Sequence, residues 1–460
     1  LTEYQAFFFK LGFHIEEFGF LYNFDAKFRL FAEKPTFYEG EWFVPNSGLQ
    51  TFLLYLDKFE YIKYGSESMP IKFNTGTIPY LTFGAGLLVS DFHNRFFLPV
   101  AKENGFYFKF DGTKLNKFKT INLPIDFTFF ITDLFDPDIM GVNTSIDIFE
   151  FTKIRKDFGL SASYSAIVDL DVNEKNRLST IDETLDSGNY RNMISNGYSS
   201  CLFLQSFFSN FVYKNRYFRI NIFNESGFLF DLYNKVYDEN VSYKQRFGFG
   251  NKFGGEIRFV EIKDSDFLLG VTLSLIATTE NFIFDYFSSN YEIVRNKKYL
   301  NLPKKGMVAI NGGFAIYFMN DNLKFYLGTT IPLGSEKFIA KFLFKFTLEK
   351  LDIKGQTNLP DLYINVTFEN GLNEIKVSDE LGYGGANGGY FLTTFTDDFR
   401  FFCEIGFKMY SAKIGMIIGL QRPQSVTPYI SPDDPNKEIN LDKYSNDLQK
   451  FVRLEVAFVL

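Results

Sequence analysis

His14 and His93 are the only histidines of the chain, so acid–base chemistry by imidazole would have to use one of them. His14 lies two positions before Glu16, and Ser161 and Ser163 fall on one alternating face of a later segment. A histidine oriented by a carboxylate activates a serine hydroxyl for attack on an ester or amide. The nucleophilic serine of many hydrolases stands in a G-x-S-x-G turn, which the chain lacks. We therefore interpret His14 as a polar lining residue and predict that the protein is not an enzyme.

Three loop-like patterns are candidates for ligand binding. Gly84-Ala85-Gly86 begins like a dinucleotide-binding loop but lacks the third glycine, so we interpret it as a tight bend or bulge of a barrel wall. Asp433, Asp434 and Glu438 offer oxygens to Ca²⁺, but their spacing matches no EF-hand, which favours a solvated surface loop. The glycine-rich run 382–389 is either a flexible external loop, or a lid or constriction loop. We expect no cofactor and no metal.

The last eleven residues, 450–460, alternate apolar and polar side chains with the period of two that defines a β-strand. The apolar face consists of Val452, Leu454, Val456, Phe458 and Leu460. In a soluble protein a terminal amphipathic strand leaves an open edge that favours aggregation. The pattern therefore favours a β-barrel whose outer surface faces lipid.

The composition agrees with a barrel wall. The 460 residues include 61 Phe, 27 Tyr and one Trp, so that 19% are aromatic, yet the mean hydropathy is only −0.08. No run approaches the roughly 18 consecutive apolar residues of a membrane helix. Alternating lipid-facing and lumen-facing residues produce this combination. The net charge of −7 comes without a basic block, so we expect no nucleic-acid partner, and Cys201 and Cys403 define no disulfide framework.

Charged side chains recur on the predicted inner face. Each would cost about 2–4 kcal/mol at the bilayer midplane, so each must face water or an opposite charge. The predicted pore-lining residues are Lys10, Asp25, Lys27, Arg29, Lys324, Lys341, Lys345, Arg400, Glu404, Lys408, Lys413, Arg453 and Glu455. Because basic residues outnumber acidic ones, an open lumen would have a weak preference for anions. A lumen crossed by salt bridges and sealed is the alternative.

The same alternation predicts a single all-β domain over residues 1–460, an antiparallel transmembrane β-barrel of about 16 to 20 strands, with 18 as the expected number. Between 201 and the final strand, the pattern includes separate strands near 217–223 and 227–233. The long connections at 234–252, 279–305, 370–397 and 421–449 fall at one end, as in barrels with short periplasmic turns and long external loops. Successive connections of an antiparallel barrel lie at opposite ends, and the predicted strands break this alternation around 171–200. That segment is a loop, an inward-folded constriction or a hidden strand. The register between 33 and 157 stays open.

The segments Phe59–Gly65 and Thr82–Val89 resemble uncharacterised outer-membrane barrels of spirochaetes, and the terminal strand with the overall patterning resembles porin-type barrels. The resemblance implies the outer membrane of a Gram-negative-type envelope, and a final strand that the barrel-insertion machinery reads as its signal. The chain departs from porins by ending on Leu460 instead of Phe or Trp. Because it starts at Leu1 with no charged-then-apolar leader, we expect that a signal peptide has been removed.

These observations lead to three hypotheses about function. The first is a porin-like channel that passes small hydrophilic solutes, with outer-membrane lipid and the insertion machinery as partners. The sequence does not determine the number of subunits. The second is a transporter of hydrophobic molecules, of the fatty-acid type. Inward Phe8, Leu21, Phe402 and Ile417 favour it, whereas a first strand that begins near Phe7 leaves no N-terminal plug. The third is an adhesin or assembly scaffold with a closed lumen.

Overall fold

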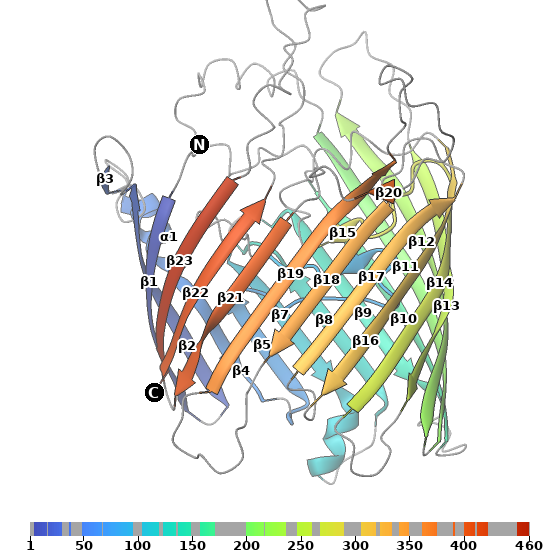
Figure 1. The fold of residues 1–460 in the computed structure, drawn as a ribbon, viewed down its shortest axis with the longest axis horizontal. Coiled ribbons are helices and arrows are strands. Elements are labelled where there is room, and N and C mark those ends of the chain that lie inside the picture. Colours follow the sequence, from blue (N-terminus) through green and yellow to red (C-terminus); the bar gives the residue numbers. More distant parts are fainter. Residues whose placement is uncertain are drawn as a thin grey trace, which may run out of the picture.

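The computed structural model describes residues 4–15, 17–29, 36–37, 48–66, 68–94, 104–118, 123–134, 137–148, 157–170, 199–215, 217–235, 246–259, 267–288, 305–318, 323–333, 340–348, 361–374, 390–391, 400–409, 412–421 and 449–459. These residues form one closed β-barrel of nineteen strands (Figure 1). The predicted all-β barrel of about 18 strands is therefore confirmed.

The wall is antiparallel from one strand to the next until it closes. The closing pair joins β1 (Tyr4–Ile15) to β23 (Gln449–Val459), and these two strands run parallel. With an odd number of alternating strands, the first and the last point the same way, so parallel closure follows from the strand count. The sequence prediction did not include this parallel pair.

The remaining wall strands follow in chain order. They are β2 (Phe18–Arg29), β4 (Phe59–Tyr64), β5 (Ile71–Gly76), β7 (Gly105–Asp111), β8 (Ile125–Ile131), β9 (Ile139–Asp147), β10 (Phe158–Asp169), β11 (Ser199–Lys214), β12 (Phe218–Lys235), β13 (Phe247–Phe259), β14 (Phe267–Thr278), β16 (Met307–Phe318), β17 (Leu323–Leu333), β18 (Ala340–Leu348), β19 (Asp361–Glu374), β21 (Arg400–Met409) and β22 (Ala412–Gln421). Short strands β3 (Thr36–Phe37), β6 (Val89–Ser90), β15 (Phe287–Ser288) and β20 (Tyr390–Phe391), helix α1 (Gly48–Asp57) and the 3₁₀ helix η2 (Gly112–Phe118) lie in the connections.

Each wall strand places apolar side chains outward and, over much of its length, polar ones inward. On β14 the outward Leu273 is 62% exposed, whereas the inward Ser274 is 3% exposed. Similar outward apolar side chains occur on β13, β16, β21, β22 and β23. Exposing one such side chain to water forgoes about 1.5–3 kcal/mol of burial. An outer surface that consists mostly of such side chains is therefore suited to an apolar surrounding.

The two ends of the barrel carry different connections. At the lower end in Figure 1, β1 ends at Ile15 and β2 begins at Phe18, and β21 ends at Met409 and β22 begins at Ala412. At the upper end, β10 and β11 are separated by 170–198, and β22 and β23 by 422–448. This agrees with the predicted asymmetry between short and long connections.

One element was predicted wrongly. The separate strands expected near 217–223 and 227–233 form the single strand β12, which pairs along its length with β11 and over most of its length with β13. Splitting β12 added a strand to the count, which is why the alternation of ends failed around 171–200. That segment itself lies almost wholly outside the described residues.

Candidate functional site

The connection between β5 and β7 turns into the lumen. Its residues 81–92 fold back on themselves, because Leu81 and Phe92 exchange backbone hydrogen bonds of 2.7 and 2.9 Å. At the turn, Gly84 and Gly86 have φ angles of +57° and +74°, which glycine adopts at little cost. We call residues 81–92 the lumen hairpin. These glycines belong to its turn, so the predicted bend or bulge of the barrel wall is wrong.

The turn of the lumen hairpin is held by two charged residues of the wall. Glu225 on β12 lies opposite Lys252 on β13. One oxygen of the fully buried Glu225 carboxylate, Oε2, accepts the N–H groups of Ala85 at 2.7 Å and Leu87 at 3.0 Å. The Lys252 ammonium donates to the Ala85 carbonyl at 2.6 Å. We call Glu225 and Lys252 the lumen clamp. Because Glu225 lies near the middle of the 18-residue strand β12, the hairpin reaches the mid-height of the wall.

A second inserted segment supports the hairpin from the side. Residues 279–288 follow β14, and their strand β15 pairs in parallel with β6 of the hairpin. Asp285 donates its N–H to the Leu87 carbonyl at 2.7 Å, and Phe287 donates to Leu88 at 2.9 Å. Asp91 of the hairpin also forms an ion pair with Lys345 on β18. The hairpin is thus attached to widely separated parts of the wall.

Apolar contacts fill the space between these inserted segments and the wall. The inserted side chains are Ile78, Leu81, Phe83, Leu87, Leu88, Val89, Phe92, Phe282, Tyr286 and Phe287. They pack on an upper apolar belt that consists of Phe130, Ile139, Ile167, Leu202, Leu204, Leu229, Ile276, Met307 and Ala309. The belt lies near the upper ends of strands between β8 and β16, on the inner face. Inward apolar residues here are explained by the inserted segments that cover them.

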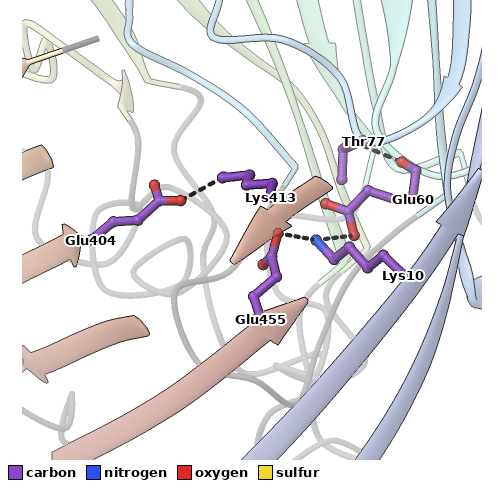
Figure 2. A network of polar contacts seen from close by, with 6 residues as sticks. All are labelled: Lys10, Glu60, Thr77, Glu404, Lys413 and Glu455. Atoms are coloured by element: carbon purple, nitrogen blue, oxygen red, sulfur yellow. Dashed lines mark hydrogen bonds and ion pairs between the residues drawn. The ribbon is translucent and has the colours of Figure 1, made fainter. Parts of the chain in front are cut away.

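A charged network occupies another part of the inner wall (Figure 2). The Lys10 ammonium on β1 lies 3.3 Å from the Glu60 carboxylate on β4 and 3.1 Å from the Glu455 carboxylate on β23. The Glu60 carbonyl accepts both the N–H and the hydroxyl of Thr77 at 2.9 Å. The Lys10 side chain is only 3% exposed, so its charge is compensated by these two carboxylates. The network links β1 to β23 across the parallel closing pair.

A second ion pair lies on the neighbouring strands. Lys413 on β22 donates to Glu404 on β21 at 2.6 Å, and Asn365 on β19 donates to the same carboxylate at 3.3 Å. The Lys413 ammonium also lies 4.6 Å from the centre of the Tyr363 ring. The ring rests against Gly415, where a Cβ would lie 2.1 Å from the Tyr363 hydroxyl. Inward glycines on this part of the wall therefore make room for an aromatic ring from a nearby strand.

The structure brings several of the predicted lining residues into acid–base pairs. Lys10, Glu455, Glu404, Lys413 and Lys345 all take part in ion pairs, and a partly exposed inner face remains at Lys345 (35%) and Lys413 (31%). Lys324 and Lys408 stand on β17 and β21, at positions that alternate inward. The structure does not describe the side chains of the other predicted lining residues, which are Asp25, Lys27, Arg29, Lys341, Arg400 and Arg453. The pairing reduces the basic excess on which the predicted anion preference depends.

Sequence reasoning missed Glu225, Lys252, Glu60 and Asp91. The first was assigned to a turn, and the others lay in segments whose register was misplaced or open. A signal was nevertheless present, since several successive strands place inward apolar residues near the same end of the barrel. A water-filled lumen gives no reason for such residues, whereas an inserted segment does.

The proposed insertion signal lies on β23. Leu454 and Phe458 point outward and are 44% and 36% exposed, and Val456 alternates with them. The side chain of Val452 and the whole of Leu460 lie outside the described part. The placement suits a lipid-facing strand, and recognition by the insertion machinery stays a prediction.

The non-catalytic role of His14 stays a prediction. His14 stands near the lower end of β1, which pairs with β2 and β23, whereas Ser161 and Ser163 stand on β10. Among the described residues, no group of three or more His, Cys, Asp or Glu side chains is arranged to hold a metal ion. The runs around Asp433 and 382–389 lie outside the described residues.

No helix in the described segments is long and apolar enough to cross a membrane. No protein-family model matches the chain, and no curated protein matches it. The resemblance to spirochaete and porin-type barrels therefore stays a prediction, and the fold itself is what the structure establishes.

Proposed function

We propose that the protein is an outer-membrane channel for small hydrophilic solutes, whose lumen is narrowed by the lumen hairpin. The observation that carries this proposal is the contrast between the two faces of the wall. The outer face is apolar and exposed, whereas charged side chains such as Lys345 and Lys413 keep about a third of their surface accessible on the inner face. A barrel of about this size is too wide for its own side chains to fill, so water can occupy the remaining lumen.

The paired charges refine the expected selectivity. Lys10, Lys345 and Lys413 each lie beside a carboxylate, so they add little net positive charge to the lumen. Lys408 is exposed near the lower end of β21 and lies 5.4 Å from the centre of the Tyr363 ring. We expect a weakly selective channel in which Lys408 contributes more to anion preference than these three lysines do, because it is exposed at the lower end of the wall, although Asp361 stands opposite it on β19.

Single-channel recording in a planar lipid bilayer tests this proposal. The refolded protein should give steady ohmic steps of current. Under a salt gradient it should give a small reversal potential whose sign indicates a preference for anions. Lys408→Glu should move the reversal potential towards cations, and Lys408→Met should move it about half as far. Lys345→Glu is a poorer variant, because it would also repel Asp91 and disturb the hairpin. Verified insertion without conductance would reject the channel and favour the closed scaffold.

The upper apolar belt favours a second candidate, the transfer of hydrophobic molecules. In that case the inserted aromatic and aliphatic side chains would form the path of an apolar solute. Vesicles that contain the protein should then take up a fluorescent long-chain fatty acid faster than empty vesicles, without ohmic conductance. Conductance with no gain in fatty-acid uptake would exclude this candidate.

A further inference from the structure

A small polar patch interrupts the outer face of the barrel on β11, β12 and β13. Its side chains are Gln205, Ser209, Asn224, Ser226 and Asn251. All other outward-facing side chains of wall strands that the structure describes are apolar or are tyrosine, threonine or cysteine. We call these five residues the outer polar patch.

The patch lies within the apolar surface and not at its rim. Along β12, Phe228 and Phe230 follow it on the upper side and Ile222 precedes it on the lower side. On the flanking strands, the outward Phe207 and Phe253 are 52% and 56% exposed. If this surface meets hydrocarbon, the patch meets it too, far from lipid headgroups.

The hydrogen bonds inside the patch leave polar atoms unused. The Asn251 amide nitrogen donates to the Asn224 oxygen at 3.0 Å and to the Ser226 hydroxyl at 2.9 Å. These two bonds use both of its donors. Among the described residues, no further bond is made by the remaining polar atoms of these three outward-facing side chains. These atoms are the Asn224 amide donors, the Ser226 hydroxyl proton and the Asn251 oxygen. Unmet polar groups of this kind are costly in hydrocarbon.

We propose that the outer polar patch is the contact surface for a second copy of this chain in the membrane. The patch is electrically neutral, so it offers no cation to a phosphate-bearing headgroup. It presents amide donors beside amide acceptors, and a two-fold axis through it would place the donors of one copy against the acceptors of the other. This inference rests on the membrane location in the proposed function, but it does not depend on conduction.

Disulfide trapping in lipid vesicles tests the contact. In a background that carries Cys201→Ser and Cys403→Ser, Ser226→Cys should form a cross-linked dimer on mild oxidation. The matched control is Thr329→Cys on β17, an outward polar residue far from the patch along the wall. We expect dimer from Ser226→Cys and only monomer from Thr329→Cys. Equal cross-linking of both variants would overturn the proposal.

Mass measurement of the intact protein in mild detergent gives a second readout. The wild type should be a dimer, and the variant Asn224→Leu with Asn251→Leu should be a monomer that still folds and inserts. A monomeric wild type, or a variant that stays dimeric, would refute the contact. Loss of conductance with an intact dimer would instead count against the channel alone, so the two proposals fail separately.

Discussion

Replacing Glu225 with alanine tests how the lumen hairpin is held. The change removes the two hydrogen bonds that the carboxylate accepts from Ala85 and Leu87. A hydrogen bond to a charged group contributes about 1.5–3 kcal/mol, so docking of the hairpin should lose about 3–6 kcal/mol. Each 1.4 kcal/mol is a factor of ten, so the undocked fraction should rise about a hundred- to ten-thousand-fold.

The hairpin should still spend most of its time docked. Leu81, Phe83, Leu87, Leu88, Val89 and Phe92 are all buried. At about 1.5–3 kcal/mol each, these six side chains contribute roughly 9–18 kcal/mol, which exceeds the contribution of the clamp. We therefore expect Glu225→Ala to produce brief openings and not a permanently wider lumen.

Hydrogen–deuterium exchange at the Ala85 and Leu87 amides measures these openings without relying on conduction. Both amides should exchange much faster in Glu225→Ala. The matched control is Glu256→Ala, which removes an inward carboxylate that contacts Arg258 and Asn221. In bilayer recordings, Glu225→Ala should add brief steps to a higher conductance level. Unchanged amide exchange in Glu225→Ala would refute the clamp.

A variant without a change of charge should have the same effect. Gly84→Ala places a Cβ 2.8 Å from the Glu225 carboxyl carbon, whereas a Cβ on Gly86 lies no closer than 3.3 Å to Ser90. Both residues have positive φ, so both substitutions cost about 1–2 kcal/mol in backbone strain. Gly84→Ala should accelerate amide exchange more than Gly86→Ala, and equal rates would show that contact with Glu225 does not matter.

Two further predictions concern stability, measured by urea unfolding with circular dichroism. Lys10→Met removes the buried ammonium that lies between the Glu60 and Glu455 carboxylates. It should lower the free energy of unfolding by about 3–5 kcal/mol. Lys408→Met, at an exposed site, should change the free energy of unfolding by less than about 1 kcal/mol, and similar losses in the two variants would contradict the buried network. Gly415→Ala forces a Cβ to within 2.1 Å of the Tyr363 hydroxyl and should cost about 1–3 kcal/mol. Gly312→Ala, where the nearest atom is 3.8 Å away, should be nearly neutral, and equal stability of the two variants would refute the packing role of Tyr363.

Alternation along the chain predicted much of the wall, because each strand carries its own period of two, but it left the strands between 33 and 157 open and split β12. On β22, Ile414 and Met416 point outward while Lys413 and Gly415 point inward, as the pattern indicates. The lumen hairpin was not predictable in this way. Its bond from Ala85 to Glu225 joins residues 140 positions apart, and neither end has a periodic pattern that marks the contact.

The misreading of β12 has a specific physical origin. Residues 224–227 read Asn-Glu-Ser-Gly, a composition typical of turns. In the strand each residue has a different task. Asn224 and Ser226 face outward to Asn251, Glu225 faces inward to the hairpin, and Gly227 leaves space for Phe282, whose ring would lie 3.1 Å from an added Cβ. Residues 224–227 therefore have the composition of a turn because this part of β12 makes polar contacts on both of its faces.

This double use also fixes the register of β12. Side chains alternate with a period of two, so a slip by one residue would turn Glu225 towards the outer face and Ser226 towards the hairpin. A charged residue on a lipid-facing surface costs about 2–4 kcal/mol at mid-depth for a basic side chain and less for an acidic one. The slip would also remove the hydrogen bonds to Ala85 and Leu87 and those from Asn251. The adjacent pairs Glu225–Lys252 and Ser226–Asn251 therefore act together: the same register that docks the hairpin inside presents the outer polar patch outside.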